Sequence, residues 1–330
     1  MLYEIQEEIP LFLQEAAASR QMQRLKNVGM NCGCEYTSLP GFCTIACYSR
    51  FEHSLNTARF VWHFTHNEKM SLAALFHDIA TPVFAHVIDF MHGDALKQET
   101  TEKGTAEIIA DSREIQTLLH RDGISTNEVS NYHLYPVADN DSPKLSADRL
   151  EYTLGNMINY GFSDADTAVS ILDDLIVGRN EEGEDEIMFS HAEKAQVFAQ
   201  AMLQCSKVYV SDEDRCAMET LARLLKKAIE AGIVTEKDLY QDEQHVISLL
   251  CTDSYWKGQW QAYCSINEVL VSEDKQGDDW FKVIAKKRRI DPYILHEGRL
   301  SKIDQNFQNQ MDQYLKTSQD VWLKGIHHGK

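Results

Sequence analysis

The sequence predicts a mostly α-helical protein, a helical bundle with a small β-hairpin and a mainly helical carboxy-terminal lobe. Apolar residues recur at helical spacing through most of the 330 residues. Proline, which interrupts helices, occurs only six times. A hydrophobic content of 43% supports an ordinary packed core. The length suits one large domain or two modest ones.

The first half of the chain contains the expected helices with the clearest apolar faces. They span residues 4–27 (one or two helices), 50–66, 69–80, 83–92, 97–110, 112–120 and 143–160. Residues 32–47 are expected to form a short β-hairpin, with Pro40-Gly41 in or beside its turn. The four cysteines of this stretch would alternatively form a zinc knot, but Cys32 and Cys34 are spaced more tightly than structural zinc sites require.

The helical pattern continues beyond residue 163. A break at Gly178 and the acidic stretch NEEGEDE predict a hairpin tip, followed by EIMFS as a strand. Further helices are expected at 191–206, 211–231 and 242–252, and FKVIAKKRRIDPYIL is expected to be a strand that Pro292 ends. No Gly/Ser/Pro-rich linker separates the two halves. We therefore expect a core domain at 1–162 and an accessory helical lobe at 163–330 packed on it.

Four potential metal ligands lie in three separate motifs. They are His53 in SRFEHSLNTA, His77 and Asp78 in LFHDIATPVFAH, and Asp148 in SADRLEY. Imidazole and carboxylate groups are ligands that suit zinc, iron, manganese or nickel. A single histidine on an apolar helix is usually only a hydrogen-bonded core residue. The combination of the four residues predicts a metal site.

The surroundings of these residues favour the same interpretation. Residues 70–76 are almost continuously apolar, so they predict a buried helix that presents His77 and Asp78 just before the break at Pro82. Ser142-Pro143 is a good helix start and Gly161 a plausible stop, which would place Leu145, Asp148 and Tyr152 on one face. A carboxylate on such a face must be paired, hydrogen-bonded or bound to metal.

The order of these motifs resembles the HD-domain metal-dependent phosphohydrolase superfamily, most closely its deoxynucleoside triphosphate triphosphohydrolase-like branch. The resemblance extends from about Met22 to Gly161 and includes MQRLKNVG and the LPG of residues 39–41. It implies an HD-domain fold and one divalent ion (Mn, Fe, Ni, Zn or Mg) bound by four ligands. These ligands are His53, His77, Asp78 and Asp148.

The resemblance also implies roles for residues around the metal. Arg50, Arg149 and Tyr152 match positions that contact substrate phosphates in the family, and His86 with Asp89 matches a pair beside the reaction centre. We expect His86, Asp89 and Asp78 to be catalytic. His86 would protonate the leaving oxygen or position the phosphate, and Asp78 would act as a base toward water.

The chain departs from the triphosphohydrolase pattern in three places. Ala80 and Thr81 stand where that branch has Gly-His, so one catalytic imidazole is missing. The stretch KQETTE lacks a further family histidine. Met30-Asn31-Cys32 replaces the Gln-Leu-Gly that reads deoxyribose in that branch. The sequence therefore predicts metal binding but does not predict triphosphate release from dNTPs.

The expected function is a metal-dependent phosphohydrolase that uses a metal-activated water on a nucleotide or related small phosphate ester. An alternative, motivated by the missing histidines, is a non-catalytic HD module that binds metal and nucleotide as a sensor or scaffold. A dinuclear iron oxygenase would need additional ligands, for which the sequence offers no clear supply.

The formal net charge of −19 disfavours binding of long nucleic acids. A small anion would need a local positive patch, which Arg50, Lys144, Arg149 and the metal ion would provide. The run from Lys286 to Arg289 is the only dense basic cluster, and it is either a solvated face or a surface for phosphate or an acidic partner.

The sequence shows no sign of export or membrane insertion. No run of eighteen apolar residues occurs, and the first ten residues carry acidic side chains where a signal peptide would be basic and then apolar. The eight cysteines are then expected to be reduced thiols. We expect a cytoplasmic protein without a membrane partner; the oligomeric state stays open, a homo-oligomer included.

Overall fold

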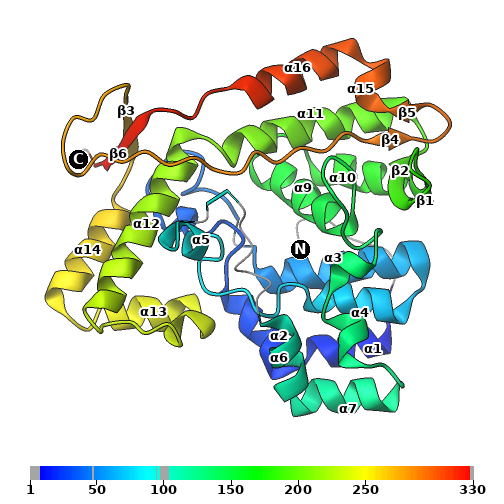
Figure 1. Cartoon of the computed structure of the whole chain (residues 1–330), viewed down its shortest axis with the longest axis horizontal. Helices are drawn as coiled ribbons and strands as arrows, with labels where there is room; N and C mark the ends of the chain where they lie inside the picture. Colours follow the sequence, from blue (N-terminus) through cyan, green and yellow to red (C-terminus); the bar gives the residue numbers. More distant parts are fainter. Residues whose placement is uncertain (1–7, 47, 94, 97–103, 328–330) are drawn as a thin grey trace.

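The structure, a computed structural model, describes residues 8–46, 48–93, 95–96 and 104–327. These residues form a mostly helical fold with two small sheets, which confirms the predicted fold class (Figure 1). The α-helices are α1 Leu11–Ala17, α2 Arg20–Arg24, α3 Arg50–Thr65, α4 Glu68–Phe76, α5 Val87–Met91, α6 Thr105–Asp111, α7 Arg113–Arg121, α8 Thr126–Val129, α9 Ala147–Asn159, α10 Ala165–Leu172, α11 Ala192–Val208, α12 Asp212–Glu230, α13 Glu243–Leu250, α14 Ser254–Cys264, α15 Leu300–Ile303 and α16 Gln305–Lys316. None of them is long and apolar enough to cross a membrane.

The strands form one four-stranded and one two-stranded sheet. β1 Leu175–Arg179 and β2 Asp185–Phe189 form the hairpin that the acidic stretch predicts. β2 also pairs in parallel with β4 Tyr293–Ile294, which pairs with β5 Gly298–Arg299. The second sheet joins β3 Glu268–Ser272 to β6 Trp322–Ile326. Strands β4 and β6 of the carboxy-terminal segment thus pair with the earlier strands β2 and β3.

Helices α3, α4 and α9 form the part of the fold that positions the potential ligands. A capping box fixes the start of α3, because the Ser49 side chain accepts from the Glu52 backbone while the Glu52 carboxylate accepts from the Ser49 backbone. α3 packs against both α4 and α9. In Figure 1, α9 lies between α3 and α11, which also packs on it. These contacts bring three distant motifs together.

The core continues from the first half of the chain into the second. Buried apolar side chains from Leu13 to Tyr314 belong to one cluster, in which α12 packs on α5 and α11 packs on α9. The division into domains at residue 162 stays a prediction.

The predicted hairpin at 32–47 is wrong over the described residues 32–46. This segment contains a short 3₁₀ helix, Cys34–Tyr36, followed by turns. Its backbone bonds locally, as from the Thr37 hydroxyl to the Cys34 carbonyl (2.7 Å), and to distant residues, as from Ser38 N to the Ile266 carbonyl (2.9 Å). Gly33 has a φ of +81°, and a Cβ there would lie 2.6 Å from Leu221, so glycine is required. Cys47 lies outside the described residues.

The predicted strand at 281–295 is also wrong for most of its length. Only Tyr293–Ile294 is a strand, and it follows Pro292 instead of ending there. Phe281 forms an isolated bridge with Leu323 of β6, but at Ala285 the Gln319 side chain takes the place of a neighbouring strand. Its amide accepts from Ala285 N (2.8 Å) and donates to Ala285 O (3.1 Å). Figure 1 shows this extended segment in orange, running across the molecule from the side of β3 to β4.

Most other predicted helices are present with shifted ends. α9 begins at Ala147 instead of residue 143, because the Ser146 side chain caps it by accepting from Arg149 N (3.3 Å). Leu145 therefore precedes the helix and shares no helical face with Asp148. α8, α14, α15, α16, β3 and β6 were not predicted from the sequence. The histidine-lacking stretch KQETTE lies outside the described residues.

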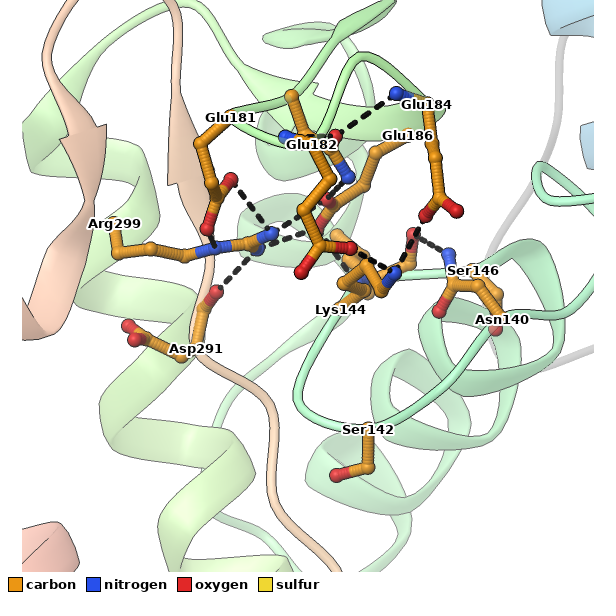
Figure 2. Close-up of polar contacts among 12 residues, drawn as sticks. Asn140, Ser142, Lys144, Ser146, Glu181, Glu182, Glu184, Glu186, Asp291 and Arg299 are labelled. Atoms are coloured by element: carbon orange, nitrogen blue, oxygen red, sulfur yellow. Dashed lines mark hydrogen bonds and ion pairs between the residues drawn. The ribbon is translucent and has the colours of Figure 1, made fainter.

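A buried ion-pair network holds the segment before α9 against the β1–β2 hairpin (Figure 2). Glu186 is fully buried, and its carboxylate accepts two bonds from Arg299 (2.6 and 2.8 Å) and one from the Leu145 backbone (3.0 Å). Arg299 also binds Glu181 and the Asp291 carbonyl. The network thereby links β5, the hairpin and the approach to Asp148.

Candidate metal centre

Three of the predicted ligands converge on one point. The His53 Nε2 atom lies 3.2 Å from His77 Nε2 and 3.0 Å from Asp148 Oδ1, and His77 Nε2 lies 3.6 Å from the same oxygen. All three ligand atoms lie within 4.8 Å of one another. α3 supplies His53, the residue after α4 is His77, and α9 supplies Asp148. This arrangement suits a single metal ion.

The fourth predicted ligand, Asp78, adjoins this group. Its Oδ2 atom lies 3.6 Å from His77 Nε2 and 3.9 Å from His53 Nε2, and it accepts a bond from Arg50 (2.9 Å). The Thr81 hydroxyl donates to its other oxygen (2.7 Å). Burial acts to raise the pKa of Asp78, but Arg50 and the two histidines hold it well below its usual range. The side chain is therefore a carboxylate beside the two imidazoles.

Hydrogen bonds at the far side of each ring orient the two imidazoles. His77 Nδ1 lies 2.6 Å from the Ala74 carbonyl, and His53 Nδ1 lies 2.6 Å from the Glu151 carboxylate. Because these oxygens accept, we assign the ring proton to Nδ1 in both histidines. When Nε2 is deprotonated, as metal binding requires, each ring presents a lone pair to the same point. Such outer partners are typical of histidines that bind metal.

Glu151 is the principal residue of the centre that sequence reasoning missed. It is fully buried on α9, three residues after Asp148, and also accepts bonds from Asn56 (3.1 Å) and the Tyr48 hydroxyl. Burial of the His53 ring acts to lower its pKa, but the bonds to Asp148 and Glu151 raise it to about 10. The surrounding oxygens therefore favour a cation, and the donor set fits a divalent metal ion.

The centre opens into a cavity of about 500 Å³. All four residues of the basic run from Lys286 to Arg289 line this cavity, as do Arg50 and Arg149. The sequence left the role of this run open between a solvated face and an anion-binding surface. The structure places it beside the metal centre, more than 130 residues beyond the last predicted ligand.

His86 and Asp89 form the predicted pair at the cavity wall. His86 Nδ1 lies 3.0 Å from the Asp89 carboxylate, and Arg288 donates to His86 Nε2 (3.2 Å). Burial, reinforced by the charges of Arg288 and Arg50, lowers the pKa of His86 to about 4 despite the pull of Asp89. His86 is therefore neutral near pH 7 and fixes the position of a guanidinium.

The remaining predicted substrate-binding residues occupy different places. Arg149 lines the cavity and donates to Asn140 Oδ1 (2.7 Å). Tyr152 also lines it, with the Arg288 guanidinium 5.8 Å from its ring centre. Lys144 does not line the cavity; it is ion-paired with Glu182 (2.7 Å) and Glu184 (2.5 Å) at the hairpin tip (Figure 2).

Two curated proteins resemble the chain over most of its length. The uncharacterized protein YdhJ of Bacillus subtilis is 27% identical over 242 residues, which cover 72% of this chain and 70% of YdhJ. The metal-dependent phosphohydrolase cns2 of Cordyceps militaris is 27% identical over 293 residues, which cover 87% of this chain and 81% of cns2. No model of a protein family matches the chain.

Two solved structures share the fold. One is a phosphohydrolase from Bacteroides thetaiotaomicron, with a TM-score of 0.63 and 13% identity over 98% of this chain and 97% of that one. The other is a hypothetical protein from Aquifex aeolicus, with a TM-score of 0.62 and 17% identity over 91% of this chain and 89% of that one. The solved structures show that this chain shares their fold, and the curated relative cns2, which is similar over most of its length, is named a metal-dependent phosphohydrolase. The triphosphohydrolase-like branch stays a prediction.

A second histidine–carboxylate pair at the cavity was also missed. His133 Nδ1 lies 2.7 Å from the Asp139 carboxylate, and both residues line the cavity. Next to it, the Tyr132 ring stacks on His77 with ring centres 5.0 Å apart. Tyr132 and His133 lie in a short 3₁₀ helix, Tyr132–Leu134, without a recognisable sequence motif, so only the fold reveals their place.

The Glu151→Gln variant is expected to bind divalent metal about ten- to a hundredfold more weakly than the wild type. The new amide would present a donor to groups that donate to Glu151, so His53 would lose its fixed orientation. Calorimetric titration of the metal-free protein with Mn²⁺ or Zn²⁺ measures the change in metal affinity. Glu107→Gln, at an exposed position of α6, is the matched control. Unchanged affinity in Glu151→Gln would contradict the orienting role.

Proposed function

We propose that this protein is a metal-dependent phosphohydrolase acting on a nucleotide or a related small phosphate ester. The main observation is that a group of two imidazoles and carboxylates lines the same cavity as four consecutive basic residues. A phosphate ester has an anionic group that matches this pairing. The name of cns2 as a metal-dependent phosphohydrolase supports the same class of reaction.

The proposed ligands of one divalent ion are His53, His77, Asp78 and Asp148. A divalent ion in such a site supplies a water of lowered pKa and polarises a phosphoryl oxygen. Asp78 is ionised, so its carboxylate can accept a hydrogen bond from the attacking water, whereas its lowered pKa disfavours the predicted role as a base. Arg50, which binds Asp78 at 2.9 Å, holds that carboxylate in place.

The basic residues that line the cavity, namely Arg149 and the run from Lys286 to Arg289, are called the cationic wall here. The cationic wall would bind the phosphoryl oxygens. Arg288 is fixed by His86, and Arg149 is fixed by its bond to Asn140, so both guanidinium groups are positioned before a ligand arrives. Positioned donors stabilise charge that develops on transferred phosphoryl groups. Because the pKa of His86 is lowered to about 4, we assign His86 a positioning role and not the role of an acid toward the leaving group.

His86→Ala and Arg149→Ala are expected to affect different kinetic constants. Loss of His86 should lower kcat by about a hundredfold with metal retained, because Arg288 would no longer be held in place. Loss of Arg149 should mainly raise KM, because it removes a contact made already in the bound substrate. Steady-state kinetics and elemental analysis of both variants test this division. Loss of metal from either variant would contradict it.

A panel of substrates with Mn²⁺, Ni²⁺, Zn²⁺, Fe²⁺ or Mg²⁺ supplied in turn tests the proposed function. We expect release of phosphate from at least one nucleotide or small ester, slow or absent hydrolysis of dNTPs, and poor discrimination between ribose and deoxyribose. Met30, Asn31 and Cys32 line the cavity in place of the family's deoxyribose-reading residues. A site that lacks groups for one sugar cannot reject its analogue strongly. Rapid hydrolysis confined to dNTPs would contradict this expectation.

One observation favours a sensor or scaffold as the second candidate. The Thr81 hydroxyl bonds to Asp78 where the triphosphohydrolase-like branch has a catalytic imidazole, so this position cannot transfer a proton near neutral pH. Tight nucleotide binding without turnover on any substrate of the panel would favour the sensor. Turnover would exclude it.

A further inference from the structure

One face of α9 leads from the metal centre to the far end of the cavity. Asp148, Tyr152 and Asn156 follow one another at intervals of four residues, and all three line the cavity. At a rise of 1.5 Å per residue, Asn156 lies about 12 Å along the helix axis from Asp148. The cavity therefore continues well beyond the space that a phosphate at the metal centre would fill.

The far end of the cavity, called the far arm here, differs in chemistry from the cationic wall. We assign to it the cavity-lining residues Asn31, Asn156, Tyr160, Tyr209, Asp214 and Met218, of which Asn156 bonds to Tyr209 and Tyr160 bonds to Asn31. The two tyrosine rings and the methionine offer apolar surface for a flat ring, since aromatic side chains stack favourably on other rings. The far arm also contains amide and carboxylate oxygens that accept hydrogen bonds.

Asn156 has an unused acceptor at the far arm. The side chain is buried, and its Nδ2 atom donates to the Tyr209 hydroxyl at 2.7 Å. Its Oδ1 atom is buried and has no hydrogen-bond partner among the described residues. Buried polar atoms of this kind nearly always have a partner in a folded protein. Because Asn156 lines the cavity, a ligand that carries an N–H group can supply the missing donor.

Asp214 is the second acceptor. Among the described residues its carboxylate has no lysine, arginine or histidine within ion-pair distance, and the Cys34 thiol, a weak donor, lies 3.8 Å away. Burial raises the pKa of Asp214 to about 7, although Arg288 and Arg215 act in the opposite direction. The carboxylate form of Asp214 would gain a charge-assisted bond from a ligand N–H and would repel a phosphate. We therefore place the phosphate end of a ligand away from Asp214.

We propose that the far arm binds the heterocyclic base of a nucleotide, and that Asp214 and Asn156 accept hydrogen bonds from the amino group of that base and, in guanine, from its ring N–H as well. The inference rests on the proposed function, because it takes the phosphate end of the ligand to lie at the metal centre. A pentose joining base and phosphate spans the interval along α9 occupied by Tyr152. The preferred bases are those with an amino group beside a ring nitrogen.

Nucleosides test the far arm separately from phosphate chemistry, because they contain the base and sugar but cannot be dephosphorylated. Calorimetry on the metal-loaded protein would compare three pairs: adenosine with purine riboside, guanosine with inosine, and cytidine with uridine. In at least one pair we expect the member with the amino group to bind about 10- to 100-fold more tightly, as a hydrogen bond to a charged group implies. Asp214→Asn should reduce that ratio to near one.

Glu213→Gln is the matched control, because it removes the same charge from the neighbouring, exposed position of α12. It should leave the ratio unchanged. Equal affinities within all three pairs for the wild-type protein would overturn the proposal without any variant, even if Asp214→Asn fails to fold. Absence of nucleoside binding would also overturn it.

A small ester without a base separates this proposal from the proposed function. Hydrolysis of p-nitrophenyl phosphate by the wild type, and equally by the control Glu213→Gln, would support phosphohydrolase activity independently of the far arm. Hydrolysis of this ester without any preference among the nucleoside pairs would overturn base recognition alone. A nucleoside preference without hydrolysis of any ester would support base recognition and reject the phosphohydrolase.

Discussion

The His77→Ala/Asp78→Ala variant is expected to lose its metal completely, whereas the wild-type protein should contain about one divalent ion per chain. The variant removes one imidazole and one carboxylate from the group that includes His53 and Asp148. Loss of outer partners costs about ten- to a hundredfold in affinity, so loss of two ligands should cost more than that. Elemental analysis of purified protein measures occupancy, and phosphate release should fall by at least about a thousandfold.

His63→Ala is the matched control for this variant. His63 lies on α3, the helix of His53, but is exposed and does not line the cavity. Its loss should change neither occupancy nor activity. Full metal occupancy in the double variant would show that the ligands are assigned incorrectly.

Arg299→Ala is expected to lower the free energy of unfolding by about 3–5 kcal/mol, the cost of leaving a buried charge without its partner. Glu186 is fully buried, and Arg299 makes two of its hydrogen bonds. The bonds from Leu145 and Asn180 would remain but bring no positive charge. Urea unfolding followed by circular dichroism measures the difference.

Two further variants serve as controls for Arg299→Ala. Arg179→Ala removes an exposed ion pair with Asp185 from the same hairpin and should cost less than about 1 kcal/mol. The double variant Arg299→Met/Glu186→Leu removes both charges and should regain much of the lost stability, because apolar residues can replace a buried pair. If Arg299→Ala is no less stable than Arg179→Ala, the buried pair is not a major contributor to stability.

The parts of the site that the sequence predicts are those encoded in short motifs. His77 and Asp78 are adjacent, and the apolar run before them already indicates a buried helix. The sequence correctly placed Asp148 on a helix, although it predicted the wrong first residue for that helix. The need of a carboxylate on an apolar face for a partner does not depend on where the first turn begins. His86 and Asp89 are three residues apart, so one short segment determines their contact.

Other features depend on contacts between distant residues. Arg288 reaches His86 across about 200 residues of sequence, and no local pattern encodes that contact. Lys144 was predicted to face the substrate, but the acidic hairpin tip attracts it instead. The alternating apolar pattern of residues 281–285 resembles a strand, yet the side chain of Gln319 bonds to its backbone. Periodicity reports burial, and it does not identify the hydrogen-bond partner.

The proposed metal ligands and the basic run of the cationic wall lie far apart in the sequence, so the ribosome synthesises the ligands first. Residues 53 to 148 leave the ribosome well before residues 285 to 289. A nascent chain can therefore contain every proposed ligand before any of the basic run exists. Cleavage within the extended segment that crosses the molecule in Figure 1 would cut the same connection in the mature protein. The residues proposed to bind the metal and the basic run proposed to bind the anion are therefore completed at different times during synthesis.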